Sequence, residues 1–151
     1  MRTEHNLQVI NLISQKNFNP KLLEKYSGFG GMGNELVEHN YYKKLNAVIS
    51  KQEIAAIKPT AKTAYYTPEF LVKFIYQALD KLGFKSGNIL EPAAGTGAFV
   101  KHIPQAMRKN SNITAIECEP FAYQILKALH PDIKSINKKF ETPLFQIIHL
   151  I

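Results

Sequence analysis

The chain is poor in cysteine, and it lacks any long apolar run. Cys118 is the one cysteine among 151 residues, so an internal disulfide is excluded and a reducing compartment is favoured. The five histidines show no spacing typical of metal ligands, and we therefore expect no metal site. No apolar run approaches the roughly 18 residues that a membrane span needs, and the N-terminus has no signal-peptide core. We expect a cytoplasmic protein with no membrane partner.

The bulk composition is that of one ordinary globular domain. At 151 residues the chain is long enough to bury roughly two-thirds of its unfolded surface. Its formal net charge of +7 favours a polyanionic partner such as nucleic acid, although many small domains are basic for no such reason. The basic residues are spread along the chain without a dominant tail, so charge alone leaves both interpretations open.

A strand, a glycine turn and a helix are predicted within Asn88-Ile-Leu-Glu-Pro-Ala-Ala-Gly-Thr-Gly-Ala-Phe-Val100. A short apolar run ends at Glu91, the turn contains Gly95 and Gly97, and apolar residues then recur at helical spacing. This arrangement lets a bound nucleoside lie against bare backbone. A second apolar run ends in Glu117, about 20 residues past the turn, where a doubly wound nucleotide site places the acid that holds ribose hydroxyls.

The charge at the first turn indicates which nucleoside it binds. A carboxylate at Glu91 would repel the phosphates of a dinucleotide or a nucleoside triphosphate, but it suits a ligand with a cationic end. The amino and sulfonium groups of S-adenosylmethionine are such an end. The third glycine of the dinucleotide fingerprint is also missing, because Val100 stands in its place. The loop therefore predicts a methyl-donor site.

A further helix is predicted to begin at Thr67, as N-cap, with Pro68 in the first helical position, and to stop at Gly83. The N-terminus of this helix offers N–H groups to an anion such as the carboxylate of the donor, unless Thr67 is a capping residue and nothing more. One apolar stripe is expected on this helix. It consists of Phe70, Leu71, Phe74, Ile75, Ala78, Leu79 and Leu82.

Alternating strands and helices predict a parallel sheet with right-handed crossovers. The expected order is strand 88–91, a helix from 98 with a break at 103 before Pro104, strand 113–117, helix 121–129 and strand 133–136. Residues 144–151 could add a fourth strand. We therefore expect a Rossmann-like α/β domain over residues 61–151, with a parallel sheet that is incomplete.

Residues 1–60 are predicted to form a helical N-terminal segment, with helices at 4–16, 21–25, 34–49 and 51–57. Gly28, Gly30 and Gly33 match a phosphate-loop pattern, but no strand precedes them, so we reject a phosphate cradle. The loop is either a flexible turn with Phe29 and Met32 tucked inward, or a cover over cofactor or nucleic acid. The tyrosines and lysines of 41–44 either lie half-buried on a solvated face or contact nucleic acid.

Three stretches resemble, in order, motifs of adenine-specific (N6) DNA methyltransferases. They are Ala64-Tyr-Tyr-Thr-Pro68, Ile89-Leu-Glu-Pro-Ala-Ala-Gly-Thr-Gly-Ala-Phe99 and Ile113-Thr-Ala-Ile-Glu-Cys-Glu-Pro120. Tyr26-Ser-Gly-Phe-Gly-Gly31 and Lys139-Phe-Glu-Thr142 resemble more particularly the methylase portion of large methylase–helicase proteins of mobile elements. The resemblance implies a fold of the S-adenosylmethionine-dependent methyltransferases.

The resemblance also implies which residues surround the donor. They are Tyr66, Thr67, Glu91, Ala93, Ala94, Gly95, Gly97, Glu117, Cys118 and Glu141. By this likeness Tyr66 and Thr67 would line the methionine end, and Glu91 would hold the ammonium group. Glu117 would take the ribose hydroxyls and Cys118 would touch the adenine.

The sequence departs from this family in two places. Related enzymes carry an Asp-Phe pair after the third strand, where Lys139-Phe-Glu141 stands here, so Glu141 is the candidate substitute for that acid. They act through an Asn/Asp-Pro-Pro-Tyr/Phe motif that accepts hydrogen bonds from the target amino group and stacks on the flipped base. No Pro-Pro pair occurs in this sequence. We therefore expect no catalytic residue here and a front portion whose catalytic half is missing, encoded elsewhere or lost.

The resulting hypothesis is an S-adenosylmethionine-binding portion of an adenine-N6 DNA methyltransferase that transfers no methyl group alone. DNA would be its partner, bound by a complete enzyme of which this chain is part or by a second methyltransferase subunit. A non-catalytic module that docks on a complete methyltransferase or on DNA is one alternative. A methyltransferase acting on RNA or protein is another, because it would share the donor site.

Overall fold

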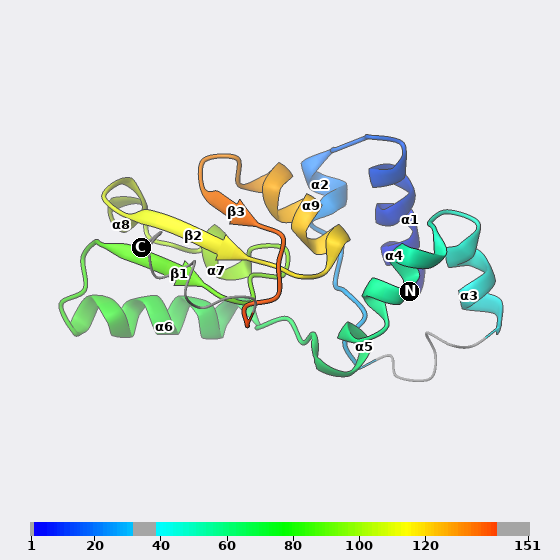
Figure 1. The fold of residues 1–151 in the computed structure, drawn as a ribbon. Coiled ribbons are helices and arrows are strands. Elements are labelled where there is room, and N and C mark those ends of the chain that lie inside the picture. The colour runs from blue at the N-terminus through cyan, green and yellow to red at the C-terminus, as the bar shows by residue number, and fades with distance from the viewer. Residues whose placement is uncertain (1, 32–38, 142–151) are drawn as a thin grey trace.

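Three short parallel strands form the sheet in the computed structural model of this protein, which describes residues 2–31 and 39–141 (Figure 1). They are β1 (Asn88–Glu91), β2 (Asn112–Ile116) and β3 (Lys134–Ile136), in the order β1-β2-β3. Both pairings are parallel, with Asn88 opposite Asn112 and Thr114 opposite Lys134. The predicted α/β class and the parallel sheet are confirmed. The predicted fourth strand lies outside the described residues.

Short helices make up the described N-terminal part of the chain. They are α1 (Arg2–Ser14), α2 (Pro20–Leu23), α3 (His39–Asn46), α4 (Lys51–Ile57) and α5 (Thr60–Thr63). The α4 helix has the predicted bounds, because a capping box between Ser50 and Glu53 fixes its start. The α3 helix ends before the predicted residue 49, while 34–38 of that prediction lie outside the described residues. The α5 helix was not predicted, since Pro59 indicated a break.

Helix α6 (Glu69–Lys81) corrects two predictions. Its N-cap is Pro68 rather than Thr67, because Pro68 has extended backbone dihedrals (φ −60°, ψ 141°). The proline side chain has no acceptor atom, and no side chain caps the helix. The predicted apolar stripe is not the buried face: Val72 and Tyr76 are buried, whereas Phe70 is exposed. The reason is that the apolar residues of α6 cover too wide an arc to face one neighbour.

The remaining helices follow the predicted order. Helix α7 (Ala98–Lys101) ends before Pro104, which caps α8 (Gln105–Lys109), so the predicted break is confirmed. Helix α9 (Pro120–Leu129) begins one residue before the predicted start. Strand β2 ends at Ile116, so Glu117 lies just beyond the strand rather than at its last position. None of the helices in the described part of the chain is long and apolar enough to cross a membrane.

The N-terminal helices lie at the end of the sheet toward which the strands point (Figure 1). Their buried residues form one core cluster with the inner face of α9, so the two predicted segments, 1–60 and 61–151, share a core. The largest fully buried members include Phe29, Leu45, Phe121 and Ile125. The N-terminal helices thereby form a wall beyond the carboxyl ends of the strands, which is where the site lies.

Candidate functional site

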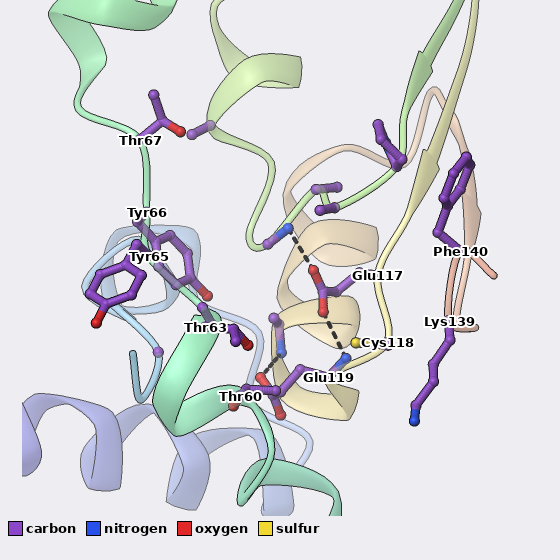
Figure 2. A pocket seen from close by; sticks show the side chains of 18 of the residues that line it. Thr60, Thr63, Tyr65, Tyr66, Thr67, Glu117, Cys118, Glu119, Lys139 and Phe140 are labelled. Atoms are coloured by element: carbon purple, nitrogen blue, oxygen red, sulfur yellow. Dashed lines mark hydrogen bonds between the residues drawn. The ribbon is translucent and has the colours of Figure 1, made fainter. Parts of the chain in front are cut away.

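A cavity of about 580 Å³ lies beyond the carboxyl ends of β1 and β2. Its size is within the range of small-molecule sites. Five stretches of chain line it: 28–29 and 138–141 with all of their residues, and 60–67, 92–99 and 117–122 in part. In Figure 2, Tyr65 and Tyr66 lie on one side, Lys139 and Phe140 on the other, and Glu117 with Cys118 between them.

Eight of the ten predicted donor residues line this cavity. They are Tyr66, Thr67, Ala93, Ala94, Gly95, Glu117, Cys118 and Glu141. Glu91 and Gly97 are not among the lining residues that the structure describes. The cavity therefore brings together residues from each of the three sequence motifs.

Gly97 serves packing rather than the cavity wall. It lies in the left-handed region (φ +95°), which favours glycine, and it is the N-cap of α7. A Cβ at this position would lie 2.5 Å from Cδ2 of His130 and 2.9 Å from Cδ1 of Leu126. Its lack of a side chain lets α7 approach α9 closely.

Gly95 and Gly28 hold the ring of Tyr66 between them. A Cβ on Gly95 would lie 3.1 Å from Cε1 of Tyr66, and a Cβ on Gly28 would lie 2.6 Å from Cε2 of the same ring. Both glycines have positive φ. The N-terminal loop and the turn after β1 therefore meet on one aromatic side chain at the cavity wall.

Glu117 organises the turns around it through both carboxylate oxygens. Its Oε2 accepts a hydrogen bond from the Gly95 N–H at 2.7 Å, and its Oε1 accepts one from the Glu119 N–H at 2.7 Å. The side chain is buried, yet it lines the cavity. A carboxylate has about four lone-pair positions, so these two bonds leave capacity for ligand hydroxyls.

Glu119 is a structural acid that the sequence analysis did not single out. Its carboxylate caps α9, accepting hydrogen bonds from the N–H groups of Phe121 and Ala122 at 2.9 and 2.8 Å. The Tyr26 hydroxyl donates to it at 2.9 Å. Burial raises the pKa of Glu119, and burial with the nearby charge of Glu119 raises the pKa of Tyr26 well above its ordinary value. An acid directly before a proline at the first helical position was the available local signal.

Glu91 stands at the end of β1, next to the cavity-lining Pro92. Its carboxylate is half-buried and accepts a long hydrogen bond from the Ala93 N–H, at 3.3 Å. Burial raises the pKa of Glu91, and the charge of Glu117 raises it further. Burial and the same charge also raise the pKa of the Cys118 thiol. The side of the site around the β1 turn is thus electronegative.

The glycine loop of residues 28–31 forms part of the cavity wall. Phe29 is fully buried, which confirms its predicted inward position, and both it and Gly28 line the cavity. A Cβ on Gly30 would lie 1.7 Å from the carbonyl oxygen of Ala64, so the loop packs directly against the segment before α6. Met32 and Gly33 lie outside the described residues.

Other lining residues were not predicted as site residues. Besides the glycine loop, they are Thr60, Thr63, Ala64, Tyr65, Pro92, Ala98, Phe99, Glu119, Ala122 and, after β3, Lys138, Lys139 and Phe140. Tyr41 is buried, and Tyr42 is half-buried with the Nζ of Lys58 5.6 Å from its ring centroid. This burial fits the interpretation of half-buried tyrosines on a solvated face. No local sequence pattern marks Thr60 or Thr63 as site residues, because a tertiary contact brings them there.

Among residues 2–31 and 39–141, no three His, Cys, Asp or Glu side chains form a group that could hold a metal ion. Comparisons with protein-family models, curated proteins and solved structures gave no match for this chain. The arrangement of its own residues therefore carries the functional argument.

Proposed function

We propose that this protein binds S-adenosylmethionine in the cavity, as the cofactor-binding portion of an adenine-N6 DNA methyltransferase with a Rossmann-like fold. One observation carries the proposal: Tyr66-Thr67, Ala93–Gly95 and Glu117-Cys118, far apart in sequence, line one cavity beyond the ends of adjacent parallel strands. Open α/β sheets bind their ligands in that position.

The charge at the first turn supports a cationic ligand over a phosphorylated one. Burial raises the pKa of Glu91 at the end of β1, and the nearby charge of Glu117 raises it further. A positive group beside these acids would relieve their mutual repulsion, whereas a pyrophosphate would increase it. Lys138 and Lys139 line the cavity as well, but they follow β3 and not the glycine turn.

The remaining donor contacts follow from the lining chemistry. Glu117, with unused acceptor capacity, is positioned for ribose hydroxyls. Phe140 and Cys118 offer an apolar wall and a polarisable sulfur for the adenine. Glu141 lines the cavity as well, and in this proposal its carboxylate accepts a hydrogen bond from the adenine amino group. The Gly28–Phe29 wall would close the site at its N-terminal side.

The proposal is confined to binding. No Asn/Asp-Pro-Pro-Tyr/Phe motif occurs in the 151 residues, so the acceptors that activate an amino nitrogen must come from other polypeptide. DNA is the proposed substrate of the assembled enzyme, and the net charge of +7 supports a polyanionic partner.

Titration calorimetry with S-adenosylmethionine, S-adenosylhomocysteine, ATP and NAD tests the proposal. We expect the two sulfur nucleosides to bind at micromolar to millimolar concentration and the two phosphorylated ligands to bind more weakly. Tighter binding of ATP or NAD, or no heat with S-adenosylmethionine at millimolar concentration, would overturn it. A matched assay with donor labelled in its methyl group and adenine-containing DNA should show no incorporation by this chain alone.

A further inference from the structure

Asn6 is a fully buried polar residue of α1, and none of the sequence motifs includes it. Its Nδ2 donates a hydrogen bond to the Gly28 carbonyl oxygen at 2.6 Å, and its Oδ1 accepts one from the Ser27 N–H at 3.1 Å. The Ser27 hydroxyl donates to the same Oδ1 at 3.4 Å. A buried amide with partners on both sides specifies one arrangement of them, because another arrangement would leave polar atoms unpaired in the core. Asn6 therefore fixes the backbone of residues 27–28 against α1.

The loop that Asn6 holds is packed on the segment that carries Tyr66. Gly30 lies so close to the Ala64 carbonyl oxygen that no Cβ would fit between them. Gly28 has a positive φ of +62°, and a Cβ on it would lie 2.6 Å from Cε2 of the Tyr66 ring. The loop thus contacts this segment both at its backbone and at the tyrosine side chain.

The ring of Tyr66 in turn forms part of the cavity wall. It is half-buried and lines the cavity, and its other edge lies against Gly95 of the turn after β1. In Figure 2 the hydroxyl of Tyr66 points toward the side of the cavity on which Glu117 lies. With a glycine at both edges, the ring can change place only if one of the two backbones moves. The place of the ring therefore depends on the loop, and through the loop on Asn6.

We propose that Asn6 is a positioning residue of this cavity: it holds the backbone of 27–28, which holds the Tyr66 ring, so that α1 controls the affinity for the ligand. The inference rests on the proposed function for the identity of that ligand, S-adenosylmethionine. Asn6 is not among the lining residues that the structure describes, so its effect on binding passes through Gly28 and Tyr66. Loss of its hydrogen bonds releases the ring from the place in which it bounds the methionine end of the site.

Calorimetry with S-adenosylmethionine on variants of this chain tests the contact between Gly28 and the ring. Gly28→Ala should weaken binding at least about fivefold, because the added methyl group displaces the ring. The matched control is Gly31→Ala, which shares the positive φ (+76°) but would place its Cβ an ordinary 3.5 Å from Cε1 of Tyr65. In a Tyr66→Ala background the effect of Gly28→Ala should vanish. An equal loss in the two glycine variants, or a loss that persists without the Tyr66 ring, would overturn the proposal.

The same measurement tests Asn6 itself. Asn6→Ala should also weaken S-adenosylmethionine at least about fivefold. The control is Ile13→Ala, which removes a buried side chain of the same helix about two turns away. It should lower stability but leave the affinity within about twofold of the wild-type value. Circular dichroism establishes that each variant is folded, and Asn6→Ser is the second variant if Asn6→Ala is not. Wild-type affinity in the folded Asn6 variant would overturn the proposal.

A measurement without ligand keeps this inference distinct from the proposed function. Tyrosine labelled with ¹³C at Cζ gives one NMR signal for each of the seven tyrosines, and Tyr66→Phe identifies that of Tyr66. The signal should shift in Asn6→Ala and Gly28→Ala, but not in Ile13→Ala or Gly31→Ala. If it does so while S-adenosylmethionine fails to bind the wild-type chain, the proposed function falls and the positioning of the ring stands. A Tyr66 signal that Asn6→Ala leaves unmoved overturns the inference, whatever the ligand.

Discussion

The turns after β1 and after β2 occupy equivalent places in consecutive strand–helix units, yet they use their acids differently. After β2, Glu117 and Glu119 accept hydrogen bonds from four backbone N–H groups. After β1, Glu91 accepts one long hydrogen bond among the described residues, from Ala93. Glu117 and Glu119 hold the chain in place, and Glu117 also keeps acceptor capacity at the cavity wall, whereas Glu91 is the least engaged of the three. Equivalent position and equal residue type therefore do not imply an equal role.

The largest expected effect is a loss of stability when an acid of the turn after β2 is replaced. Glu119→Ala removes the cap of α9 and leaves the buried Tyr26 hydroxyl without its acceptor. We expect the free energy of unfolding to fall by about 3–4 kcal/mol. Urea denaturation followed by circular dichroism measures it, with Glu24→Ala, at an exposed ion pair with Lys101, as the control. Equal losses in the two variants would mean that Glu119 has no special structural role.

A smaller effect, with a distinct pH dependence, is expected for Tyr26→Phe. The Tyr26 hydroxyl lowers the pKa of Glu119 against the larger opposing effect of burial, so its removal raises that pKa further. An acid with a raised folded pKa costs stability once pH exceeds the unfolded value, and the cost is complete above the folded one. The loss, about 2 kcal/mol at neutral pH, should therefore shrink as pH falls toward the ordinary glutamate range. A loss independent of pH in denaturation series would contradict this coupling.

The smallest expected effect tests the ligand side of the comparison. Glu91→Gln removes the charge at the β1 turn and should weaken S-adenosylmethionine about tenfold, roughly 1.4 kcal/mol, with little loss of stability. Because the pKa of Glu91 is raised and a cation favours its ionised form, wild-type affinity should fall as pH drops through that pKa. Calorimetry at several pH values measures both. Unchanged affinity in Glu91→Gln would mean that the carboxylate of Glu91 does not contact the donor.

The sequence predicted correctly those elements whose positions depend on residues close together in the chain. The strand at 88–91, the helix at 51–57 and the break before Pro104 depend on residues within one or two turns, and each was located from sequence. The start of α6 was misplaced because Thr67-Pro68 also fits an extended proline N-cap.

Contacts between residues far apart in the chain could not be predicted from such local patterns. Tyr26 and Glu119 are 93 residues apart, and no local spacing relates them. Gly97 was assigned to the donor turn because its sequence context is that of the turn, but its absent side chain faces His130 and Leu126. The direction of the buried face of α6 depends on its neighbours, and its own wide apolar arc left that direction undetermined.

The ring of Tyr66, held between Gly28 and Gly95, makes the first sixty residues part of the binding architecture. An excised fragment beginning at residue 61 would keep the strands and the glycine turn, but one flank of that ring would lose its support. The same excision would expose the inner side of α9, which the N-terminal helices cover. The minimal unit for studying the pocket therefore includes the helical segment.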